Sequence, residues 1–410
     1  MGLAINIHAR IGSLSVTMKY KRESIMKTRL KRHSFHQIIF SVICFLLGPI
    51  LKWMYAFRTD RKVRIEGPFL LLANHVTAAD PVLVCLSFAQ QMYIVADEHL
   101  MQKGFASRLL HLFFDPIIRR KGDSAVTAVK EILACLKSGF NVCIFPEGTC
   151  SFDGTNSPML PTIGKLSKTC GTTLVTYRFE GGFFTLPRWG RGIRRGKYYG
   201  HVEHIYTPDM LRQMSPAEIN EHIAKDLKEN AYDRIQSDPV SYKSRVRAEW
   251  LESGFFLCPS CSQVGTIHTS GETVVCKKCG LDGRLDSQYR LHGFPFDTLE
   301  EWERFQNSWL TDQISREDFE FTDEDAVLIQ TDDRHRRKVI CSGPLKMDRN
   351  ALSVGTFSFP LSKMAGMEIV RRNLLVFSMP DSFYQVTGSK TLCTRKYFQF
   401  YRLLKGETLS

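Results

Sequence analysis

Short apolar runs alternate with stretches of helical periodicity from residue 63 to about residue 235, and this alternation limits the possible fold most strongly. The apolar runs are predicted strands because they are short and bounded by turn residues. They cover residues 69–73, 92–96, 116–119, 141–145 and 172–179. Residues 124–136 place apolar side chains three and four apart, which predicts a helix covering one sheet face. The predicted fold class is α/β, with a mixed or parallel sheet flanked by helices over residues 60–245.

The α/β domain is predicted to close with a helix that begins at Ser215. The Ser215 hydroxyl can cap this helix, Pro216 suits its first position, and Glu218 completes a capping box. The chain has 410 residues, so there is room for two or three domains of roughly 100 to 200 residues each. Further modules are therefore expected after residue 245.

A basic and then apolar stretch precedes the α/β domain. Residues 38–51 run for about 14 residues without a charge, below the ~20 that a helix needs to span a bilayer. Gly48 and Pro49 are expected to kink this run. Lysines and arginines lie on both sides of it, and Trp53 and Tyr55 follow, as is typical of a membrane interface. Residues 1–59 are thus predicted to be a basic arm and a hydrophobic anchor on the cytoplasmic face, monotopic or a single helix. A buried core helix is the alternative.

Two CxxC pairs define the segment 250–292 as a predicted zinc ribbon. The four cysteines are Cys258, Cys261, Cys276 and Cys279. Two such turns can aim four thiolates at one point, and the metal replaces a core that so short a segment cannot build. The other cysteines are scattered singly, which is typical of a reducing compartment rather than a disulfide framework. A structural zinc ion is expected; an iron centre and four unligated thiols are the alternatives.

Residues 293–410 are predicted to form an α+β, β-rich domain of unknown role. Residues 298–310 and 394–404 have helical patterns, whereas 351–359 and 373–378 alternate as strands do. Several strands and a closing helix resemble the outline of a pleckstrin-homology-like module. No motif in this region identifies a ligand.

The first chemical motif is a histidine that directly follows the predicted strand 69–73. His75 is followed by Asp80 and Pro81, so Asp80 is expected to cap the next helix and the residues between them to form a turn. Such a turn can bring the carboxylate back to the imidazole. An aspartate on one ring nitrogen fixes the tautomer and leaves the other nitrogen to take a proton from a substrate hydroxyl. The spacing alone is weak, because a structural histidine beside a capping aspartate has the same pattern.

The second motif, Phe145-Pro146-Glu147-Gly148-Thr149, follows the predicted strand 141–145. Parallel sheets bind ligands at this edge. Together, HxxxxD and FPEGT, each after a strand, resemble the motifs of the glycerolipid acyltransferase family that includes 1-acylglycerol-3-phosphate acyltransferases. The resemblance covers about residues 60–240, although residues 174–182 lack the proline expected in the fourth family block.

The resemblance implies site residues. His75 and Asp80 match the catalytic pair, and Arg119 resembles the arginine that binds the acceptor's phosphate. The loop that binds the acceptor is matched by Glu147, Gly148 and Thr149. Many members have an arginine after this loop, whereas this chain has Cys150. Phosphate binding would then depend more on the remaining cations, because a thiol cannot form the two-pronged contact of a guanidinium. These cations are Arg119, Arg120, Lys121 and Arg178.

The resemblance implies a membrane-associated O-acyltransferase that forms phosphatidic acid in phospholipid biosynthesis. The acyl donor would be acyl-CoA or acyl-carrier protein, and the acceptor 1-acylglycerol 3-phosphate. The alternatives are another acceptor, such as glycerol 3-phosphate or a different lysophospholipid, and a catalytically inactive membrane-attached binding protein. In the expected single step, His75 takes the hydroxyl proton and backbone N–H groups near Gly148 meet the oxyanion. A ping-pong scheme through Cys150 or Cys143 is the rival.

A second group of cations is expected to form a basic surface. The formal net charge of +13 favours anionic partners, and five cations with nearby aromatic residues fall between residues 188 and 199. These are Arg188, Arg191, Arg194, Arg195 and Lys197. Membrane phosphates or the phosphates of the acyl carrier are the favoured partners. Nucleic acid, which such a cluster beside a zinc ribbon can also bind, is the less favoured one.

Overall fold

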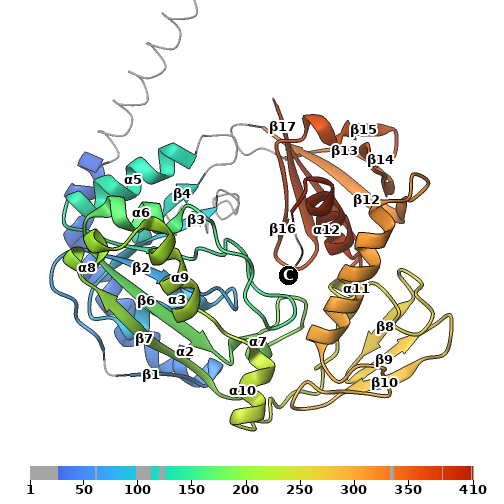
Figure 1. Cartoon of the computed structure of the whole chain (residues 1–410), viewed down its shortest axis with the longest axis horizontal. Helices are drawn as coiled ribbons and strands as arrows, with labels where there is room; N and C mark the ends of the chain where they lie inside the picture. Colours follow the sequence, from blue (N-terminus) through green and yellow to red (C-terminus); the bar gives the residue numbers. More distant parts are fainter. Residues whose placement is uncertain are drawn as a thin grey trace, which may run out of the picture.

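The computed structural model describes residues 26–60, 62–97, 112–119, 125–332, 337–380, 382–407 and 409. Residues 1–25, the first part of the predicted basic arm, lie outside this range. In the described part, three sheets follow one another along the chain (Figure 1). The mixed α/β sheet, the cysteine-bearing segment and the β-rich C-terminal region are all present as predicted. The division into independently folding domains stays a prediction.

The first sheet is mixed, with mostly parallel neighbours. Its seven strands stand in the order β1-β7-β6-β2-β5-β3-β4, and only the β6–β7 pair is antiparallel. The bounds are β1 Phe57–Thr59, β2 Phe69–Ala73, β3 Met92–Asp97, β4 Ile117–Arg119, β5 Asn141–Ile144, β6 Thr173–Glu180 and β7 Tyr198–Tyr206. All five strands predicted from the sequence therefore exist, with ends within one residue of those expected.

Both faces of this sheet are covered, and the alternation of side chains along β2 separates two cores. Leu70 and Leu72 pack into one core, whereas Phe69, Leu71 and Ala73 pack into the other. The first core is covered by α5 Ala125–Lys137, α6 Ile163–Cys170, α8 Pro208–Gln213 and α9 Pro216–Asp226. The second is covered by the N-terminal helices, α3 Asp80–Leu83, η1 Val84–Ser87, α7 Gly182–Thr185 and α10 Ala231–Ser237.

Two N-terminal helices contact the cores on both faces of the sheet: Met26 packs against the first core, and Leu51 and Tyr55 pack against the second. The helices are Met26–Leu46 and α2 Gly48–Tyr55, and they are bent by 49° at the break between them. This confirms the predicted kink at Gly48 and Pro49. Among the described residues, no single helix is long and apolar enough to cross a membrane, although this bent pair passes the same test of length and composition together. Phe40 and Cys44 join the core.

The cysteine-bearing segment is a small antiparallel sheet in the order β11-β10-β9-β8. It follows η3 Leu251–Ser253 and consists of β8 Ile267–Ser270, β9 Thr273–Cys276, β10 Asp282–Leu285 and β11 Leu291–His292. Helix α11, Leu299–Ile314, closes it, and the Trp302 indole N–H donates to the Leu257 carbonyl at 2.8 Å. The neighbouring helix α11 therefore supplies part of the core of this short sheet.

The C-terminal region is a seven-stranded antiparallel sheet with a helix at its end. The strand order is β15-β14-β13-β12-β18-β17-β16, so the first and last strands of the set are neighbours. The bounds are β12 Phe321–Thr331, β13 Arg337–Met347, β14 Ala351–Val354, β15 Phe357–Pro360, η4 Leu361–Lys363, β16 Gly366–Val370, β17 Leu374–Met379, β18 Ser382–Gly388 and α12 Thr394–Leu404. The predicted run 351–359 is a hairpin, because Gly355 turns the chain at φ +55°. The pleckstrin-homology-like assignment stays a prediction.

Candidate active site

The two sequence motifs meet at one edge of the first sheet. Strands β2 and β5 are parallel neighbours, so the residues that follow them emerge side by side. His75 follows β2, and Glu147 follows β5. The backbone N–H of His75 donates to Glu147 Oε1 at 2.9 Å, and the N–H of Ser151 donates to the His75 carbonyl at 3.3 Å. The sheet thus joins two motifs that lie far apart in the sequence.

The Glu147 carboxylate contacts the protein on both oxygens. Besides His75 N, it accepts from the Asn156 side-chain amide at 3.0 Å and from the Ser157 N–H at 2.7 Å. The side chain is buried, and this burial raises the pKa of Glu147 to about 7 although the three N–H donors lower it. In this arrangement Glu147 holds the two loops together; the family resemblance, in contrast, assigned it to acceptor binding.

Asp80 lies beside the His75 ring and is fixed by several donors. His75 Nδ1 is 3.1 Å from Asp80 Oδ2, and the same oxygen accepts from the N–H groups of Val76 at 2.6 Å and Thr77 at 2.8 Å. The Thr77 hydroxyl donates to Oδ1 at 2.5 Å, and the Tyr198 hydroxyl also donates to this oxygen. The expected helix cap is wrong: Asp80 is the first residue of α3 and its carboxylate turns back into the loop. It therefore orients the imidazole.

Cys150 lies against the His75 ring at nearly equal distances from its two nitrogens. Its Sγ lies 3.5 Å from His75 Nε2 and 3.7 Å from Nδ1. Burial lowers the pKa of His75, but the Cys150 and Asp80 side chains outweigh it and hold that pKa well above the ordinary value. The side chain of His75 is 17% exposed. Asp80 and Cys150 thus both lie against the His75 ring.

The remaining residues of the acceptor loop lie at the same edge. Gly148 adopts φ +67°, and the position that a Cβ would occupy there is 3.9 Å from Arg119 Nη1. Arg119, at the end of β4, therefore lies beside the loop as the sequence predicted. The N–H of Gly148 itself donates to the Phe145 carbonyl at 3.1 Å. Stabilisation of the oxyanion by other N–H groups near Gly148 stays a prediction.

Arg188 links this loop to the C-terminal sheet, a contact that the sequence did not predict. It donates to the Thr149 hydroxyl, to the Cys150 carbonyl at 3.3 Å and to the Arg371 carbonyl at 2.8 Å. It also donates to the Ile369 carbonyl. Burial lowers the pKa of Arg188 to about 10, so it stays protonated at neutral pH. The turn between β16 and β17 is thereby joined to the site.

The cations expected to form a basic surface between residues 188 and 199 are divided between interior and surface: Arg194 is buried, whereas Arg191 and Arg195 are exposed. Trp189, Arg194 and Tyr198 are buried. Arg191 pairs with Glu249 at 3.0 Å, and Lys197 pairs with Asp238 at 2.7 Å. These side chains do not make one exposed patch. No pattern of charges in the sequence distinguishes a cation that pairs inside the fold from one that faces solvent.

Three further cations were candidates for binding phosphate beside Arg119. Arg178 already pairs with Glu180 at 3.2 Å and with Glu203 at 3.0 Å, so it is engaged within the protein. Arg120 and Lys121 lie outside the described residues. Among the described candidates, Arg119 is therefore the one at the site.

The four predicted metal ligands come together in the second sheet. The sulfur atoms of Cys258, Cys261, Cys276 and Cys279 all lie within 4.8 Å of one another. Cys258 Sγ is 3.7 Å from Cys279 Sγ, and Cys261 Sγ is 3.8 Å from Cys276 Sγ. In a tetrahedral site with Zn–S bonds of about 2.3 Å, neighbouring sulfurs are about 3.8 Å apart. The donor set and spacing fit a structural metal ion.

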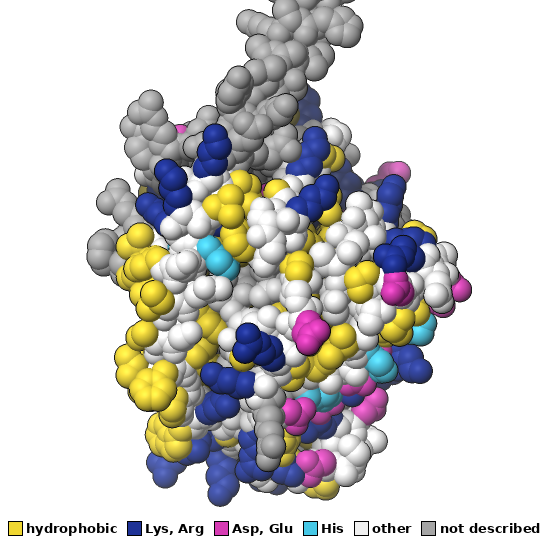
Figure 2. All heavy atoms as spheres, turned by 90° about the vertical axis from the view of Figure 1, so that its left-hand side faces the viewer, with side chains coloured by type: hydrophobic (Ala, Val, Ile, Leu, Met, Phe, Trp, Pro, Cys, Tyr) yellow, Lys and Arg dark blue, Asp and Glu magenta, His cyan; other side chains and the backbone are white. Residues whose placement is uncertain are grey.

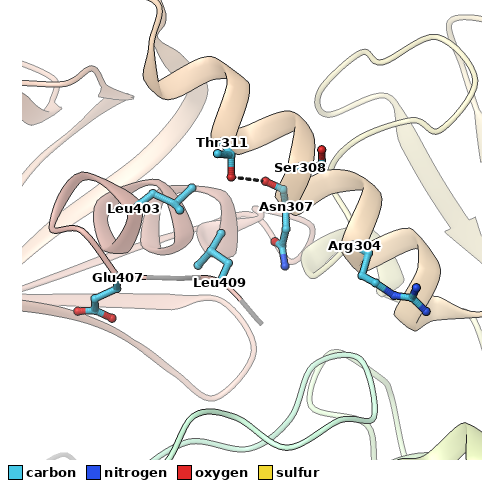
Figure 3. Close-up of a pocket in the computed structure, with 7 residues that line it drawn as sticks. All are labelled: Arg304, Asn307, Ser308, Thr311, Leu403, Glu407 and Leu409. Atoms are coloured by element: carbon cyan, nitrogen blue, oxygen red, sulfur yellow. Dashed lines mark hydrogen bonds between the residues drawn. The ribbon is translucent and has the colours of Figure 1, made fainter.

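A pocket of about 340 Å³ lies away from these motifs, between α11 and the end of the chain (Figure 3). It is lined by Arg304, Asn307, Ser308, Thr311, Leu403, Glu407 and Leu409. The Thr311 hydroxyl is used within the helix, donating to the Asn307 carbonyl at 2.9 Å. This lining offers neither a histidine nor a cysteine, so it does not compete with the edge of the first sheet as a site for acyl transfer.

Comparisons with known proteins match the same part of the chain. Residues 55–186 match the family model described as Acyltransferase, and they include His75, Asp80, Arg119 and Glu147. Among solved structures, the chain is similar to the 1-acyl-sn-glycerophosphate (LPA) acyltransferase PlsC from Thermotoga maritima. The two share 17% identity at a TM-score of 0.40, over 52% of this chain and 89% of that chain.

Proposed function

From the acyltransferase domain over residues 55–186 we infer that this chain is a membrane-associated O-acyltransferase of phospholipid biosynthesis. The donor is acyl-CoA or acyl-carrier protein, and the acceptor is 1-acylglycerol 3-phosphate. The product is then phosphatidic acid. The observation that carries this proposal is the His75–Asp80 pair, which stands beside Arg119 at the sheet edge.

The geometry suits acyl transfer to a hydroxyl. Asp80 binds Nδ1 of His75, so Nε2 is the nitrogen that faces the site and can take a proton. As the hydroxyl proton moves to Nε2, the oxygen attacks the thioester carbon and the carrier thiol leaves. Asp80 stabilises the imidazolium that forms. Its four additional donors, the N–H groups of Val76 and Thr77 and the hydroxyls of Thr77 and Tyr198, hold the carboxylate in place.

Arg119 is proposed to bind the acceptor's phosphate, because a guanidinium can contact two phosphate oxygens at once. Cys150 in place of the family's arginine leaves one cation fewer at this point. The presence of Cys150 instead of arginine favours a second candidate, in which the acceptor is different. Glycerol 3-phosphate and another lysophospholipid are examples. A panel of acceptors offered with one acyl-CoA separates these candidates.

The proposal is tested by His75→Ala, which should lower kcat by about 10²- to 10⁴-fold at saturating substrate while the fold is kept. Asp80→Asn should also lower kcat, since an amide supports the wrong tautomer. Arg119→Ala should instead raise KM for the acceptor more than KM for the donor. His222→Ala, at an exposed histidine, is the control. Near-normal transfer by His75→Ala would overturn the mechanism.

Membrane attachment is proposed to use the N-terminal helices. Nine apolar side chains on and between these helices are more than two-fifths exposed: Leu30, Phe35, Ile38, Val42, Phe45, Leu46, Leu47, Ile50 and Trp53. On the face seen in Figure 2, hydrophobic side chains gather along one edge, with Lys and Arg side chains above and below them. Such an arrangement suits an interface in which apolar groups enter the acyl region and cations meet anionic head groups.

Sedimentation of the full-length chain with anionic phosphatidylglycerol vesicles tests this attachment. Phe45→Ser and Trp53→Ser should each weaken binding by about tenfold or more, because each removes about 1.5 to 3 kcal/mol of apolar burial. Val339→Ser is the matched control, since this valine is as exposed but lies in the C-terminal sheet. A full-length protein that stays in the supernatant would contradict attachment.

A further inference from the structure

The loop of residues 148–150 ends in Cys150, where the family resemblance leads one to expect an arginine. A phosphate monoester carries a charge of about −1.5 to −2 at neutral pH, and a thiol offers it no charge-assisted contact. Arg119 supplies a single positive charge. A second cation beside this loop is therefore needed to balance the phosphate of the proposed acceptor.

Arg188 reaches this loop, but its donors are already used within the protein. It donates to the Thr149 hydroxyl and, at 3.3 Å, to the Cys150 carbonyl. Its other two nitrogens donate to the Ile369 carbonyl and, at 2.8 Å, to the Arg371 carbonyl. Because each of its three nitrogens has an acceptor in the protein, Arg188 connects two segments and is not the missing phosphate ligand.

This connection brings the turn between β16 and β17 to the loop. Arg188 Nε contacts the Arg371 carbonyl and Arg188 Nη1 contacts the Cys150 carbonyl, so one guanidinium separates the two backbones. In Figure 1, β16 and β17 lie on the side of the C-terminal sheet that faces the first sheet. A side chain of this turn therefore lies within reach of the acceptor loop.

Arg371 is the cation of this turn that stays available. Its side chain is exposed, and within the described part of the chain it forms neither an ion pair nor a hydrogen bond. Its neighbour Arg372, in contrast, lies over the Trp250 ring, 3.8 Å from the ring centre. Arg371 also adopts φ +58°, a conformation that glycine and asparagine adopt more readily than arginine does. The backbone therefore gives no reason for an arginine at this position.

Arg119 approaches the same loop from the first sheet. Its Nη1 lies 3.9 Å from the position that a Cβ would occupy at Gly148, and it too forms no ion pair with the residues that the structure describes. Guanidiniums from two different sheets, both without a carboxylate partner there, therefore flank the loop beside His75. Two such groups can share the oxygens of one phosphate.

We propose that Arg371 is a second binding residue for the phosphate monoester of the acceptor, and that it supplies from the C-terminal sheet the charge that Cys150 does not. This proposal rests on the proposed function. In 1-acylglycerol 3-phosphate the free hydroxyl is on the carbon next to the one that bears the phosphate. A phosphate held between Arg119 and Arg371 therefore also restricts where this hydroxyl lies relative to His75. The phosphates of the acyl carrier are the other source of such a charge.

Three variants separate the charge of Arg371 from the shape of its turn. Arg371→Asn removes the charge but keeps a residue that tolerates a positive φ, so the carbonyl that accepts from Arg188 stays in place. Arg371→Lys keeps the charge without the two-pronged contact. Arg349→Asn is the matched control, at an exposed arginine in the turn between β13 and β14, and β12 and β18 lie between the two turns. All three should unfold at the same temperature as wild type.

Initial rates of the purified full chain in neutral detergent, with acyl-CoA as donor, test the proposal. Arg371→Asn should raise KM for 1-acylglycerol 3-phosphate by about 10- to 100-fold, the usual effect of losing a charge-assisted contact. Its kcat and its KM for acyl-CoA should stay within about twofold of wild type. Arg371→Lys should recover part of the loss, and Arg349→Asn should behave as wild type.

Equilibrium binding of radiolabelled lipids without any donor gives a second readout. Arg371→Asn should raise Kd for 1-acylglycerol 3-phosphate by the same factor as KM. It should leave Kd for uncharged 1-acylglycerol unchanged, because that lipid has no phosphate. Equal losses for the two lipids would overturn the proposal, since the shape of the turn and not the charge of Arg371 would then matter.

The remaining outcomes distinguish this proposal from the function on which it rests. An acceptor KM in Arg371→Asn within about twofold of wild type would overturn the role of Arg371 and leave the acyltransferase standing. A rise confined to KM for acyl-CoA would also overturn it, because Arg371 would then bind the carrier's phosphates. A wild type that transfers no acyl group, yet binds 1-acylglycerol 3-phosphate through Arg371, would overturn the proposed function alone.

Discussion

Glu147 shows how one buried side chain can join the loops that form a site. Its carboxylate joins the loop after β2 to the loop after β5, through His75 N on one oxygen and Ser157 N on the other. The residue types at these positions were visible in the sequence. The partners were not, because they lie in other segments. Glu147 is therefore a positioning residue in this arrangement.

Glu147 should make stability depend on pH. Its pKa is raised from 4.5 to about 7 in the folded chain, mainly by burial, so the folded state holds this proton over a range in which the unfolded state has lost it. Stability from this group is therefore present below pH 4.5 and falls as pH rises to 7, by up to about 3 kcal/mol. Urea unfolding of wild type and Glu147→Gln across this range should show wild type losing stability relative to the variant. Wild type that keeps or gains stability relative to the variant as pH rises from 4.5 to 7 would contradict the raised pKa.

At the scale of elements, one buried arginine fixes the N-terminal helix to the sheet. Arg29 donates to Asp115 at 2.7 Å and to Glu131 at 2.9 Å, and its guanidinium lies 4.8 Å from the centre of the Tyr93 ring. It is 1% exposed. Asp115 belongs to the segment that leads into β4 and Arg119, so this contact connects the proposed membrane helix to the proposed phosphate-binding strand.

Removing the Arg29 guanidinium should lower the free energy of unfolding. Arg29→Ala leaves its carboxylates buried without the guanidinium, and breaking a buried pair costs about 3–5 kcal/mol. Urea unfolding of the detergent-purified chain measures the effect. Arg32→Ala, at an exposed arginine of the same helix, should change stability by less than about 0.5 kcal/mol. Equal effects of the two substitutions would show that the buried contact does not hold the helix.

The ribbon sheet has a different source of stability. Its four strands are only two to four residues long. Two cysteines of the cluster precede β8, and the other two lie at the end of β9 and in the loop that follows it. A segment this short gains its fold from a metal and from packing on α11. Loss of the metal, or loss of the packing on α11, should therefore unfold the ribbon segment.

Elemental analysis of the purified chain should find about one zinc per molecule, because four protein sulfurs close a structural tetrahedral site. Cys276→Ser should lose the metal and increase hydrogen exchange over residues 255–292. Cys341→Ser makes the same chemical change outside the cluster and should keep both. A metal-free wild type with a protected ribbon would refute the assignment.

At the scale of the whole molecule, the C-terminal sheet takes part in shaping the site. Arg188 binds carbonyls of the β16–β17 turn and groups of the loop that carries Thr149 and Cys150. Arg188 and Arg395 of α12 also lie over the Phe152 ring, at 4.5 and 4.2 Å from its centre. The last third of the chain is therefore joined to the acceptor loop through side chains.

Arg188→Gln should loosen this connection. It removes the charge and several donors, so stability should fall by about 1–3 kcal/mol, and hydrogen exchange should rise at residues 149–150 and 369–372 together. Arg191→Gln is the control, since the Arg191 side chain is 57% exposed and its pair with Glu249 is worth at most about 1 kcal/mol. Increased exchange in the turn alone would show that the loop is held without Arg188.

The sequence by itself determined the features that depend on residues close together in the chain. Five of the seven strands of the first sheet followed from short apolar runs, the helix at Ser215 from its capping box, and the metal cluster from two CxxC turns. In each case the interacting groups lie within a few residues, or the spacing itself carries the geometry. The positions of His75 and Glu147 at one edge also followed, because neighbouring parallel strands end together.

Only the tertiary structure decided which side chains meet at that edge. Tyr198 reaches Asp80 from another strand, Cys150 faces His75, and Arg188 binds the turn before Arg372. No local period links these residues, since each contact depends on how strands and loops far apart in the sequence pack. A charge or a thiol looks the same in a sequence whether it faces water or a buried partner. Its environment, and therefore its chemistry, is set by the packing of the whole chain.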